Sequence, residues 1–391
     1  MKKKIVIIGP AYPYRGGQAL VEAHLFSTLT KLGYDCHTIS FSLLYPKIFF
    51  PGKTQFDQSK NVFFSHQDRI HRIINSINPL SWYRAIQKIK ALAPDNVIFI
   101  WWMPFFGPAY GTIAHFVKKL TGAKITFLVE NYISHEDRWF DRFFSKITLD
   151  IADYFVCQSE FVKKQIAAVH QKPIFKTTLS VYDCYNFGTY DKASARRFLN
   201  IPEGDRVILF FGLIRRYKGL DKLIRAFPMI KNGDDNYSLL IVGECYEKIS
   251  YYEDIIREEG IEDKTTLINQ FIDNEKIEPY FKAADMVCLP YNSASQSGIL
   301  MIAYGFNIPV VVNDVGGLSE LVVEGKTGTV IPNNSPAAIA KGVAKVYEYG
   351  ETENFEENIG NLNQHLGYSN VEEMMGKMLE TEDVTQMNNK R

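Results

Sequence analysis

The sequence lacks the features that would place it in a membrane or in an oxidising compartment. No apolar run reaches the roughly 20 residues that a spanning helix needs, and the most apolar segment, 97–110, contains two prolines and a glycine. The early run IVII is too short for a secretory leader. The five cysteines include no C-x-x-C pair, so zinc and dithiol chemistry are disfavoured and most should be small core residues. These absences predict a cytoplasmic protein.

The chain also lacks net charge, but its charges are unevenly distributed. Residues 1–180 hold 23 Lys+Arg against 12 Asp+Glu, whereas residues 181–391 hold 21 against 32. A basic first half indicates an anionic partner or surface, and the alternative is a chance separation of solvated charges. At 391 residues with 46% hydrophobic side chains, the chain exceeds what one core usually organises, so two domains are expected.

Short apolar runs alternate with amphipathic stretches along the chain. Strands that are apolar throughout and alternate with helices indicate parallel sheets covered on both faces, so the fold class is α/β with two doubly wound units. We predict a first domain over 1–182, against which a helix at about 366–385 packs, and a second domain over 190–362. The expected helices are 18–32, 82–92, 113–120, 160–169, 220–230, 251–259, 274–283 and one from Ile299.

Two loops after predicted strands have the composition of ligand sites. Gly16 and Gly17 allow a sharp turn into a helix whose first amides favour an anionic or hydroxyl-rich ligand. The pair does not match G-x-G-x-x-G, which disfavours a nicotinamide or flavin enzyme. Arg215, Arg216 and Lys218 follow a strand of the second unit, at the sheet edge where doubly wound folds bind ligands. A solvated turn is the alternative interpretation of these cations.

A third loop offers backbone amides. The run YNSASQSG ends with Ser297 and Gly298 at a predicted helix start, where consecutive N–H groups can hold a diphosphate. Gly316 and Gly317 follow the next strand, and Glu320 lies one turn further on. The Arg215–Lys218 loop and the loop before Gly298 together predict a phosphate site in the second unit.

These segments resemble the retaining GT-B glycosyltransferases of glycosyltransferase family 4. The resemblance covers most of residues 205–330, through FFGLIRRYKGL, LLIVGE, AADMVCLPY and SQSG followed by AYGFNIPVVVNDVGGLSE, and the first half matches more loosely through YPYRGGQA, WWMPFFGPAYGT and VENYISHEDRWFD. It implies two facing Rossmann-like domains with a cleft between them. The second domain would bind the nucleotide sugar, and the first would present the acceptor.

Carried over by position, the resemblance also implies roles for individual residues. Lys218 and Arg215 would hold the diphosphate, and the amides of Ser297 and Gly298 would donate to it. His135, in ISHEDR, would face the donor sugar. The further residues implied in donor binding are Gly16, Gly17, Gly243, Glu244, Ile272, Glu275, Gln296, Ile299 and Glu320.

The chain departs from this family's pattern at three positions. Most relatives have two glutamates eight positions apart before the I-P-V-V strand, and Ala294 and Ile302 stand there in this chain. Leu213 stands where an Arg usually follows the F-G turn. We interpret the changes as those of a subgroup, in which Gln296 or Glu320 supplies replacement contacts.

The resemblance implies a retaining hexosyltransferase that uses a UDP- or GDP-linked sugar and no cofactor. No two aspartates are two positions apart, so the D-x-D triplet that holds a metal in many transferases is absent. Residues 41–56 interleave aromatics with lysines, which fits contact with anionic lipid at the inner face of a membrane, although a core-packing loop is the alternative. A glycan or polyprenyl-diphosphate-linked acceptor in surface polysaccharide synthesis would fit.

Two other functions compete with transfer. A catalytically silent GT-B subunit that binds a nucleotide or glycan is suggested by the missing glutamates. A nucleotide-sugar isomerase would need an acid and a base, for which Glu130, His135 and Glu136 are candidates. Nucleic-acid binding is disfavoured because no RNA or DNA module is recognisable.

Overall fold

The computed structural model describes residues 3–50, 52, 54–59, 66–132, 139–231, 236–367, 371–376 and 378. These residues form two compact units. Unit 1 contains the described part of the chain through Ser180 except Ser59, together with the described residues from Leu366 on, and unit 2 contains Ser59 and Val181–His365. Each unit is built on one parallel sheet, so the prediction of two doubly wound α/β folds is confirmed.

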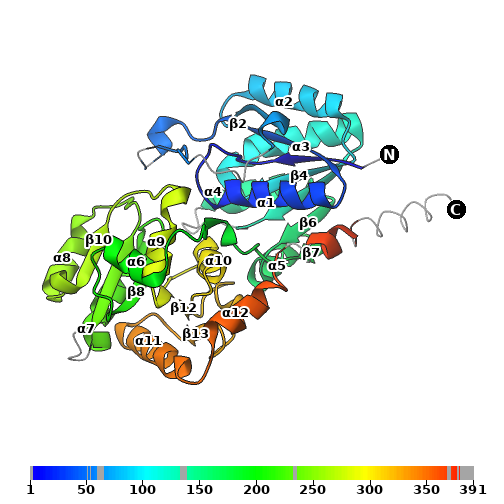
Figure 1. Ribbon diagram of the computed structural model, residues 1–391. Helices are drawn as coiled ribbons and strands as arrows, with labels where there is room; N and C mark the ends of the chain where they lie inside the picture. The colour runs from blue at the N-terminus through cyan, green and yellow to red at the C-terminus, as the bar shows by residue number, and fades with distance from the viewer. Residues whose placement is uncertain are drawn as a thin grey trace. The chain divides into compact units, whose positions relative to one another are not determined.

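Unit 1 has a seven-stranded sheet in the order β3-β2-β1-β4-β5-β6-β7, all parallel. Figure 1 shows α1 on one face of this sheet and α2 and α3 on the other. The elements are β1 (Lys4–Ile8), α1 (Gly17–Lys31), β2 (Asp35–Leu43), η1 (Lys47–Phe49), η3 (Gln67–Arg69), β3 (Ile70–Asn75), α2 (Pro79–Leu92), β4 (Asn96–Trp101), η4 (Pro104–Phe106), α3 (Gly107–Thr121), β5 (Lys124–Val129), α4 (Trp139–Leu149), β6 (Tyr154–Cys157), α5 (Glu160–Ala167) and β7 (Ile174–Lys176).

The central strands of unit 1 are apolar on both faces because helices cover both. Ile5 to Ile8 are at most 1% exposed, and Val97 to Trp101 at most 2%. On one face, Phe99 contacts Tyr110 of α3 edge-on at 5.2 Å and stacks with Phe127 of β5 at 5.0 Å between ring centroids. Burial of such large rings contributes most of the hydrophobic free energy of a sheet of this type.

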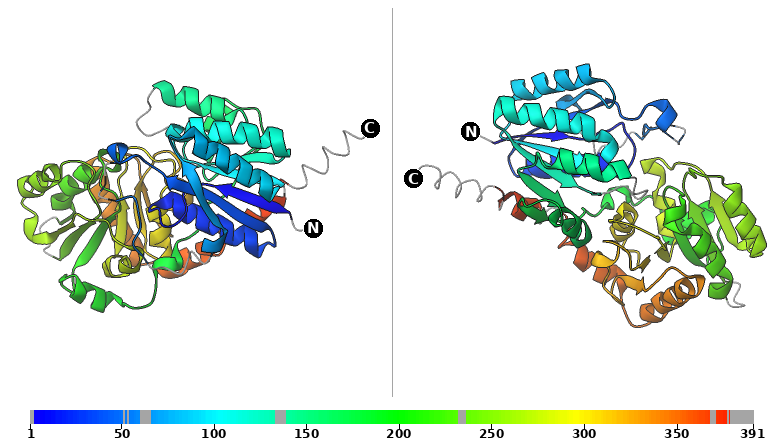
Figure 2. Two further views of the ribbon diagram at one scale, coloured as in Figure 1. Left: turned by 90° about the horizontal axis from the view of Figure 1, so that it is seen from above. Right: turned by 180° about the vertical axis from the view of Figure 1, so that it is seen from behind.

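Unit 2 has a six-stranded parallel sheet in the order β10-β9-β8-β11-β12-β13. The two further views in Figure 2 show helices on both faces of this sheet also. The elements are η5 (Asp183–Tyr185), α6 (Lys192–Phe198), β8 (Arg206–Phe211), η6 (Arg216–Lys218), α7 (Leu220–Lys231), β9 (Tyr237–Val242), α8 (Ser250–Glu258), η7 (Glu262–Lys264), β10 (Thr265–Ile268), η8 (Asn274–Lys276), α9 (Glu278–Ala283), β11 (Met286–Leu289), α10 (Gly298–Gly305), β12 (Val310–Asn313), η9 (Ser319–Leu321), β13 (Gly328–Ile331), α11 (Pro336–Gly350) and α12 (Phe355–Asn363).

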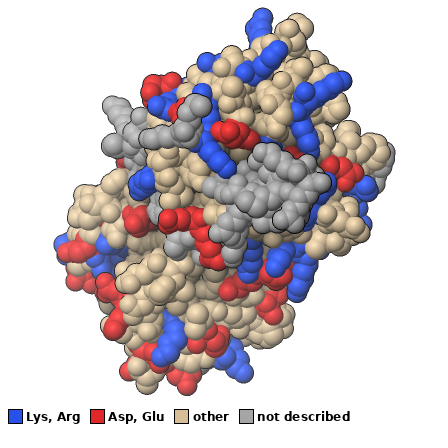
Figure 3. Space-filling view, turned by 90° about the vertical axis from the view of Figure 1, so that its right-hand side faces the viewer, with Lys and Arg blue, Asp and Glu red and all other residues tan. Residues whose placement is uncertain are grey.

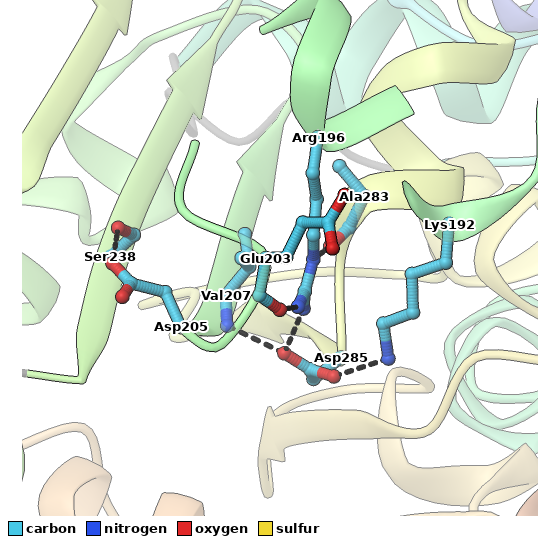
Figure 4. Close-up of polar contacts among 8 residues, drawn as sticks. All are labelled: Lys192, Arg196, Glu203, Asp205, Val207, Ser238, Ala283 and Asp285. Carbon is cyan, nitrogen blue, oxygen red and sulfur yellow. Dashed lines mark hydrogen bonds and ion pairs between the residues drawn. The ribbon is translucent and has the colours of Figure 1, made fainter. Parts of the chain in front are cut away.

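The amino edge of the unit 2 sheet carries a partly buried ionic cluster. Asp285, just before β11, accepts from Arg196 of α6 at 2.8 Å and from the amide of Val207 in β8 at 2.6 Å, and it pairs with Lys192 (Figure 4). Arg196 also donates to the carbonyl oxygens of Ala283 and Glu203. Arg196 and Asp285 each have several partners, so this cluster ties α6 to the starts of β8 and β11. It lies at the edge opposite the carboxyl ends of the strands.

Several elements escaped the sequence analysis. Strand β3 carries His71 and Arg72 and so lacks a continuous apolar run, and α2 and α3 begin several residues earlier than expected. Helices α4, α6, α11 and α12 were not expected either. For α11 the sequence did contain a signal. The Ser335 hydroxyl accepts a hydrogen bond from the amide of Ala338, and a proline occupies the first position of the helix. Within the expected carboxyl-terminal helix, 371–376 are helical.

Three further expectations concerned the cysteines, membrane-spanning helices and the uneven distribution of charge. All five cysteines are free thiols, and Cys36, Cys157, Cys184 and Cys288 are buried. Within the described part of the chain, no helix combines the length and hydropathy needed to cross a bilayer. Acidic and basic side chains lie side by side over much of the face in Figure 3, so the unequal charge of the two halves does not form one large patch there.

Candidate functional site

The carboxyl edge of the unit 2 sheet brings together loops from four strands. Strand order reverses between β8 and β11, since β9 and β10 lie on one side of this pair and β12 and β13 on the other. In doubly wound sheets this switch point is where ligands bind. The loop after β8 carries Lys218, and the loop after β11 leads to Ser297, so the predicted phosphate contacts come from the two strands that flank the switch point.

Glycines allow the backbones of these loops to touch. A Cβ on Gly243, after β9, would lie 1.8 Å from the carbonyl oxygen of Gly212, after β8. A Cβ on Gly219, whose φ is +67°, would lie 2.1 Å from the carbonyl oxygen of Pro290, after β11. The amide of Ile214 donates to Glu244 at 3.0 Å. No side chain larger than hydrogen fits at either glycine, and the loops are therefore held as one rigid edge.

Lys218 is a buried cation in this edge. The residue is 8% exposed, and its ammonium lies 5.1 Å from the centroid of the Tyr291 ring. Among the described residues it has no hydrogen bond or ion pair to a carboxylate. Burial, with repulsion from Arg215, holds the pKa of Lys218 below its ordinary value. A buried charge normally has a partner in the folded protein, so an anionic ligand is the group that this ammonium lacks.

The two arginines of the same loop, Arg215 and Arg216, have different partners. The guanidinium of Arg215 lies 5.1 Å from the centroid of the Tyr246 ring, and among the described residues it has no carboxylate partner. Arg216 instead lies over Tyr251 of α8 and pairs with Glu247, and its side chain is 75% exposed. Arg215 and Lys218 thus remain available for an anion, whereas the charge of Arg216 is already compensated.

The amino end of α10 lies beside Lys218. A Cβ on Gly212 would lie 3.2 Å from the Lys218 Nζ and 3.1 Å from the Cδ1 of Ile299, the second residue of α10. Ser297 is the residue before α10 and uses no side-chain hydrogen bond to cap it. The first amides of this helix therefore add a positive dipole end to the same place as the ammonium.

The other predicted donor-binding residues of unit 2 come from the loops after β9, β10, β11 and β12. Gln296 is half-buried next to Ser297, and Glu244 is 6% exposed at the end of β9. Glu320 is exposed in η9, although its loop is tied to the site because Gly317 donates to Ala294 at 3.2 Å. Buried Ile272 and exposed Glu275 follow β10, the outermost strand on that side of the sheet.

The positions that differ from the resembled family are apolar and buried. Ala294 is 4% exposed and Ile302 is 5% exposed, and Ile302 lies within the fully apolar stretch of α10. Leu213 is half-buried in the loop after β8. No acidic side chain comes from these three positions.

Unit 1 has a comparable switch point between β1 and β4. Gly16 precedes α1 with a φ of +110°, and both Gly16 and Gly17 are exposed. His135 lies outside the described residues. Glu130, which follows β5, was considered only as an acid or base for the isomerase, yet it is 6% exposed and accepts from the Gln18 amide of α1 at 3.0 Å. A charged residue directly after an apolar strand was the signal in the sequence.

Burial raises the pKa of Glu130 to about 7, although the hydrogen bond from Gln18 partly opposes the shift. Since the folded protein favours the protonated acid, the contribution of Glu130 to stability is complete below its ordinary pKa of 4.5 and is lost as the pH rises through about 7. The Glu130→Gln variant does not titrate there. Its free energy of unfolding relative to wild type should therefore rise by about 2 to 3 kcal/mol between pH 5 and pH 8. Urea denaturation of both proteins at pH 5 and pH 8 measures this difference in the free energy of unfolding. An equal difference at the two pH values would contradict the prediction.

No group of three or more His, Cys, Asp or Glu side chains that could hold a metal ion occurs among the described residues. In unit 2 the site consists of cations, amides and a helix terminus. Groups of this kind stabilise negative charge.

Part of the chain is similar to a known protein family. Residues 191–362 match the family described as Glycosyl transferases group 1. An uncharacterized glycosyltransferase of Methanocaldococcus jannaschii is 28% identical over 207 residues, which are 50% of this chain and 52% of that protein. The chain spans between 34% and 52% of the length of the curated relatives it matches.

Solved structures match along nearly the whole chain. Sucrose-phosphate synthase from Thermosynechococcus elongatus has a TM-score of 0.74 at 16% identity, over 98% of this chain and 100% of that one. The Anabaena protein HepE, solved in complex with UDP-glucose, has a TM-score of 0.71 at 13% identity, over 97% and 99%. At these identities the likeness shows the fold alone, which is the GT-B fold.

Proposed function

We propose, on the premise that residues 191–362 form a domain of the glycosyl transferases group 1 family, that this protein transfers a sugar from a nucleotide diphosphate sugar to a hydroxyl group of an acceptor. The observation that carries the proposal is the buried Lys218 ammonium, which has no carboxylate partner among the described residues and lies beside the amino end of α10. A diphosphate supplies the missing negative charge. HepE was solved with UDP and with UDP-glucose, which supports a donor of this class.

The proposed chemistry uses the site to stabilise a leaving group. The bond from the anomeric carbon to the diphosphate oxygen breaks, and the oxygen gains negative charge as the sugar acquires oxocarbenium character. Lys218, Arg215 and the amides at Ser297 and Gly298 stabilise that charge. The acceptor oxygen bonds to the anomeric carbon from the face that the diphosphate leaves, so configuration is retained. The acceptor proton passes to the departing phosphate oxygen, and no protein base is needed.

The acceptor class is inferred from unit 1. We propose a glycan or a polyprenyl-diphosphate-linked glycan, used in surface polysaccharide synthesis. Ile48 is 86% exposed beside exposed Lys47, and Phe56 is 45% exposed. Together with the basic excess of residues 1–180, these side chains suit peripheral contact with anionic lipid at the inner face of a membrane.

A thermal-shift panel tests the donor assignment. UDP or GDP, whichever the site accepts, and its sugars should raise the melting temperature of unit 2. A ligand at 100 times its dissociation constant adds about 2.7 kcal/mol of stability. Uridine and guanosine, which lack the diphosphate, should give little shift. The shift should survive EDTA, since the proposed site uses no divalent ion.

The same ligands separate the competing functions when the thermal shift is combined with an assay of nucleoside diphosphate release and of nucleotide-sugar interconversion. No shift with any nucleoside diphosphate would contradict the diphosphate site. A shift without slow release of nucleoside diphosphate from any nucleotide sugar would favour the catalytically silent subunit. Interconversion of nucleotide sugars without that release would favour the isomerase.

A further inference from the structure

Tyr291 is a buried aromatic residue two positions after β11, and its ring lies beneath the ammonium of Lys218. The residue is 3% exposed, and the Lys218 Nζ lies 5.1 Å from the centroid of the ring. A cation within about 6 Å of a ring centroid is attracted by the negative face of the ring, and the attraction is stronger where water is excluded. Tyr291 can therefore hold the side chain of Lys218 in one place.

An aromatic ring holds a cation differently from a carboxylate. A carboxylate forms hydrogen bonds with an ammonium and cancels its charge, so it would compete with any anionic ligand. A ring has no net charge and attracts the cation through its quadrupole, which leaves the charge and the N–H donors of the ammonium to a ligand. The contact with Tyr291 thus orients the Lys218 ammonium without neutralising it.

Two buried asparagines fix the main chain that carries the Tyr291 ring. The Nδ2 of Asn334, which follows β13, donates to the carbonyl oxygen of Pro290 at 2.9 Å. The Nδ2 of Asn313, at the end of β12, donates to the carbonyl oxygen of Tyr291 at 2.8 Å. Asn313 is 4% exposed and Asn334 is 9% exposed. Because a buried polar group that loses its partner is costly, these contacts hold the segment in one conformation.

Asn292 joins this segment to the loop of Lys218. Its amide donates to the carbonyl oxygen of Tyr217, the residue before Lys218, at 2.6 Å. The Oδ1 atoms of Asn292 and Asn334 both accept from the ammonium of Lys222 in α7, at 2.8 and 2.6 Å. The ring and the cation therefore come from two loops that are tied to each other, and the folded sheet edge sets the distance between them.

We propose that Tyr291 is a positioning residue, whose ring is seated by Asn313 and Asn334 and holds the Lys218 ammonium at the diphosphate site without neutralising it. The purpose of the held charge rests on the proposed function. The contact itself lies within unit 2 and can be measured without a ligand.

Tyr291→Leu removes the ring, and Tyr291→Phe keeps it. The dissociation constant of UDP or GDP, whichever binds the wild type, should rise about 10-fold in Tyr291→Leu, because the ammonium loses the group that orients it. It should return to within about 3-fold of wild type in Tyr291→Phe, since a phenyl ring also attracts cations. Isothermal titration calorimetry measures both. Tyr291→Met, whose side chain adapts to irregular gaps, replaces Tyr291→Leu if that variant does not fold.

A double-mutant cycle separates positioning from a merely structural role. In the Lys218→Met background, Tyr291→Leu should change the dissociation constant of the diphosphate by less than about 2-fold, because the ring no longer has a cation to hold. A ring that only supports the fold would cause the same loss in both backgrounds. Tyr251→Leu is the matched control, since Tyr251 is 37% exposed and its ring lies under Arg216 at 5.0 Å. Its affinity should stay within about 2-fold of wild type.

Titration of the Lys218 side chain by NMR measures the contact without a ligand. The ring favours the charged form of the ammonium, so the pKa of Lys218 should be lower in Tyr291→Leu than in the wild type. In Tyr291→Phe it should remain at the wild-type value. Arg215 and Tyr217 also act on this ammonium, and both stay in place in every variant.

The failures of the two proposals are distinguishable. Wild-type protein that binds neither UDP nor GDP, while the titration of Lys218 still depends on the ring, would contradict the diphosphate site alone. The positioning role would be overturned by a folded Tyr291→Leu variant whose diphosphate affinity and Lys218 titration match the wild type. An equal loss of affinity in the Lys218→Met background would overturn it as well.

Discussion

Replacing Lys218 by methionine should lower turnover of the donor by at least about 100-fold and leave unit 2 as stable as the wild type or more stable. The ammonium is the buried charge that meets the developing phosphate charge, and removal of one such donor typically costs a factor of 10² to 10³. Methionine has a similar length and leaves no cavity. Because the pKa of Lys218 is held below its ordinary value by burial, its charge destabilises the unliganded fold, and the variant removes that cost.

Arg216→Met is the matched control for this experiment. It removes the same charge from the same loop, but Arg216 points to Tyr251 and Glu247 and its side chain is 75% exposed. Its turnover should stay within about 3-fold of wild type, since exposed ion pairs contribute little. Nucleoside diphosphate release and urea denaturation of both variants provide the two readouts. Near-normal turnover in Lys218→Met would remove the assignment of this residue.

Replacing Gly243 by alanine should prevent unit 2 from folding normally, with a loss of more than about 4 kcal/mol. The new Cβ would lie 1.8 Å from the carbonyl oxygen of Gly212 and 2.6 Å from its carbonyl carbon, so the loops after β8 and β9 would have to separate. These loops also carry Lys218 and Glu244. Any folded fraction should therefore have lost affinity for nucleoside diphosphates as well.

Gly204→Ala provides the comparison. A Cβ at Gly204 meets no atom within 4 Å, and its φ lies outside the positive range, so this variant should unfold within about 0.5 kcal/mol of wild type. Denaturant unfolding followed by circular dichroism measures both variants. Equal stability of Gly243→Ala and wild type would show that the two loops are not locked together.

The fold was largely predictable from particular runs of residues. Continuous apolar segments such as those of β1, β4 and β8 are distinctive because a strand covered on both faces has no polar side, and they defined two parallel sheets. Elements that break the usual pattern of buried apolar and exposed polar residues were harder to predict. Strand β3 lies at the edge of its sheet, so His71 and Arg72 interrupt the pattern, and α4 presents exposed Phe143 and Ile147 where polar residues would be expected.

The candidate site was predictable only in part. Composition alone did not distinguish Arg216 from Arg215 and Lys218, and only the family resemblance left it out. In the structure Arg216 lies over Tyr251. The sequence also did not raise Glu130 above a minor alternative. A carboxylate after a strand is common, and the burial of Glu130 is visible only in the folded chain.

The sequence by itself determined the class of fold and the chemical character of each loop, because these depend on local composition and on periodicity along the chain. Tertiary structure decided which loops meet. Strands β8 and β11 are separated by more than 70 residues, and their adjacency places Lys218 next to the start of α10. Burial, which lowers the pKa of Lys218 and raises that of Glu130, depends on atoms from distant elements and therefore cannot be read from neighbours in sequence.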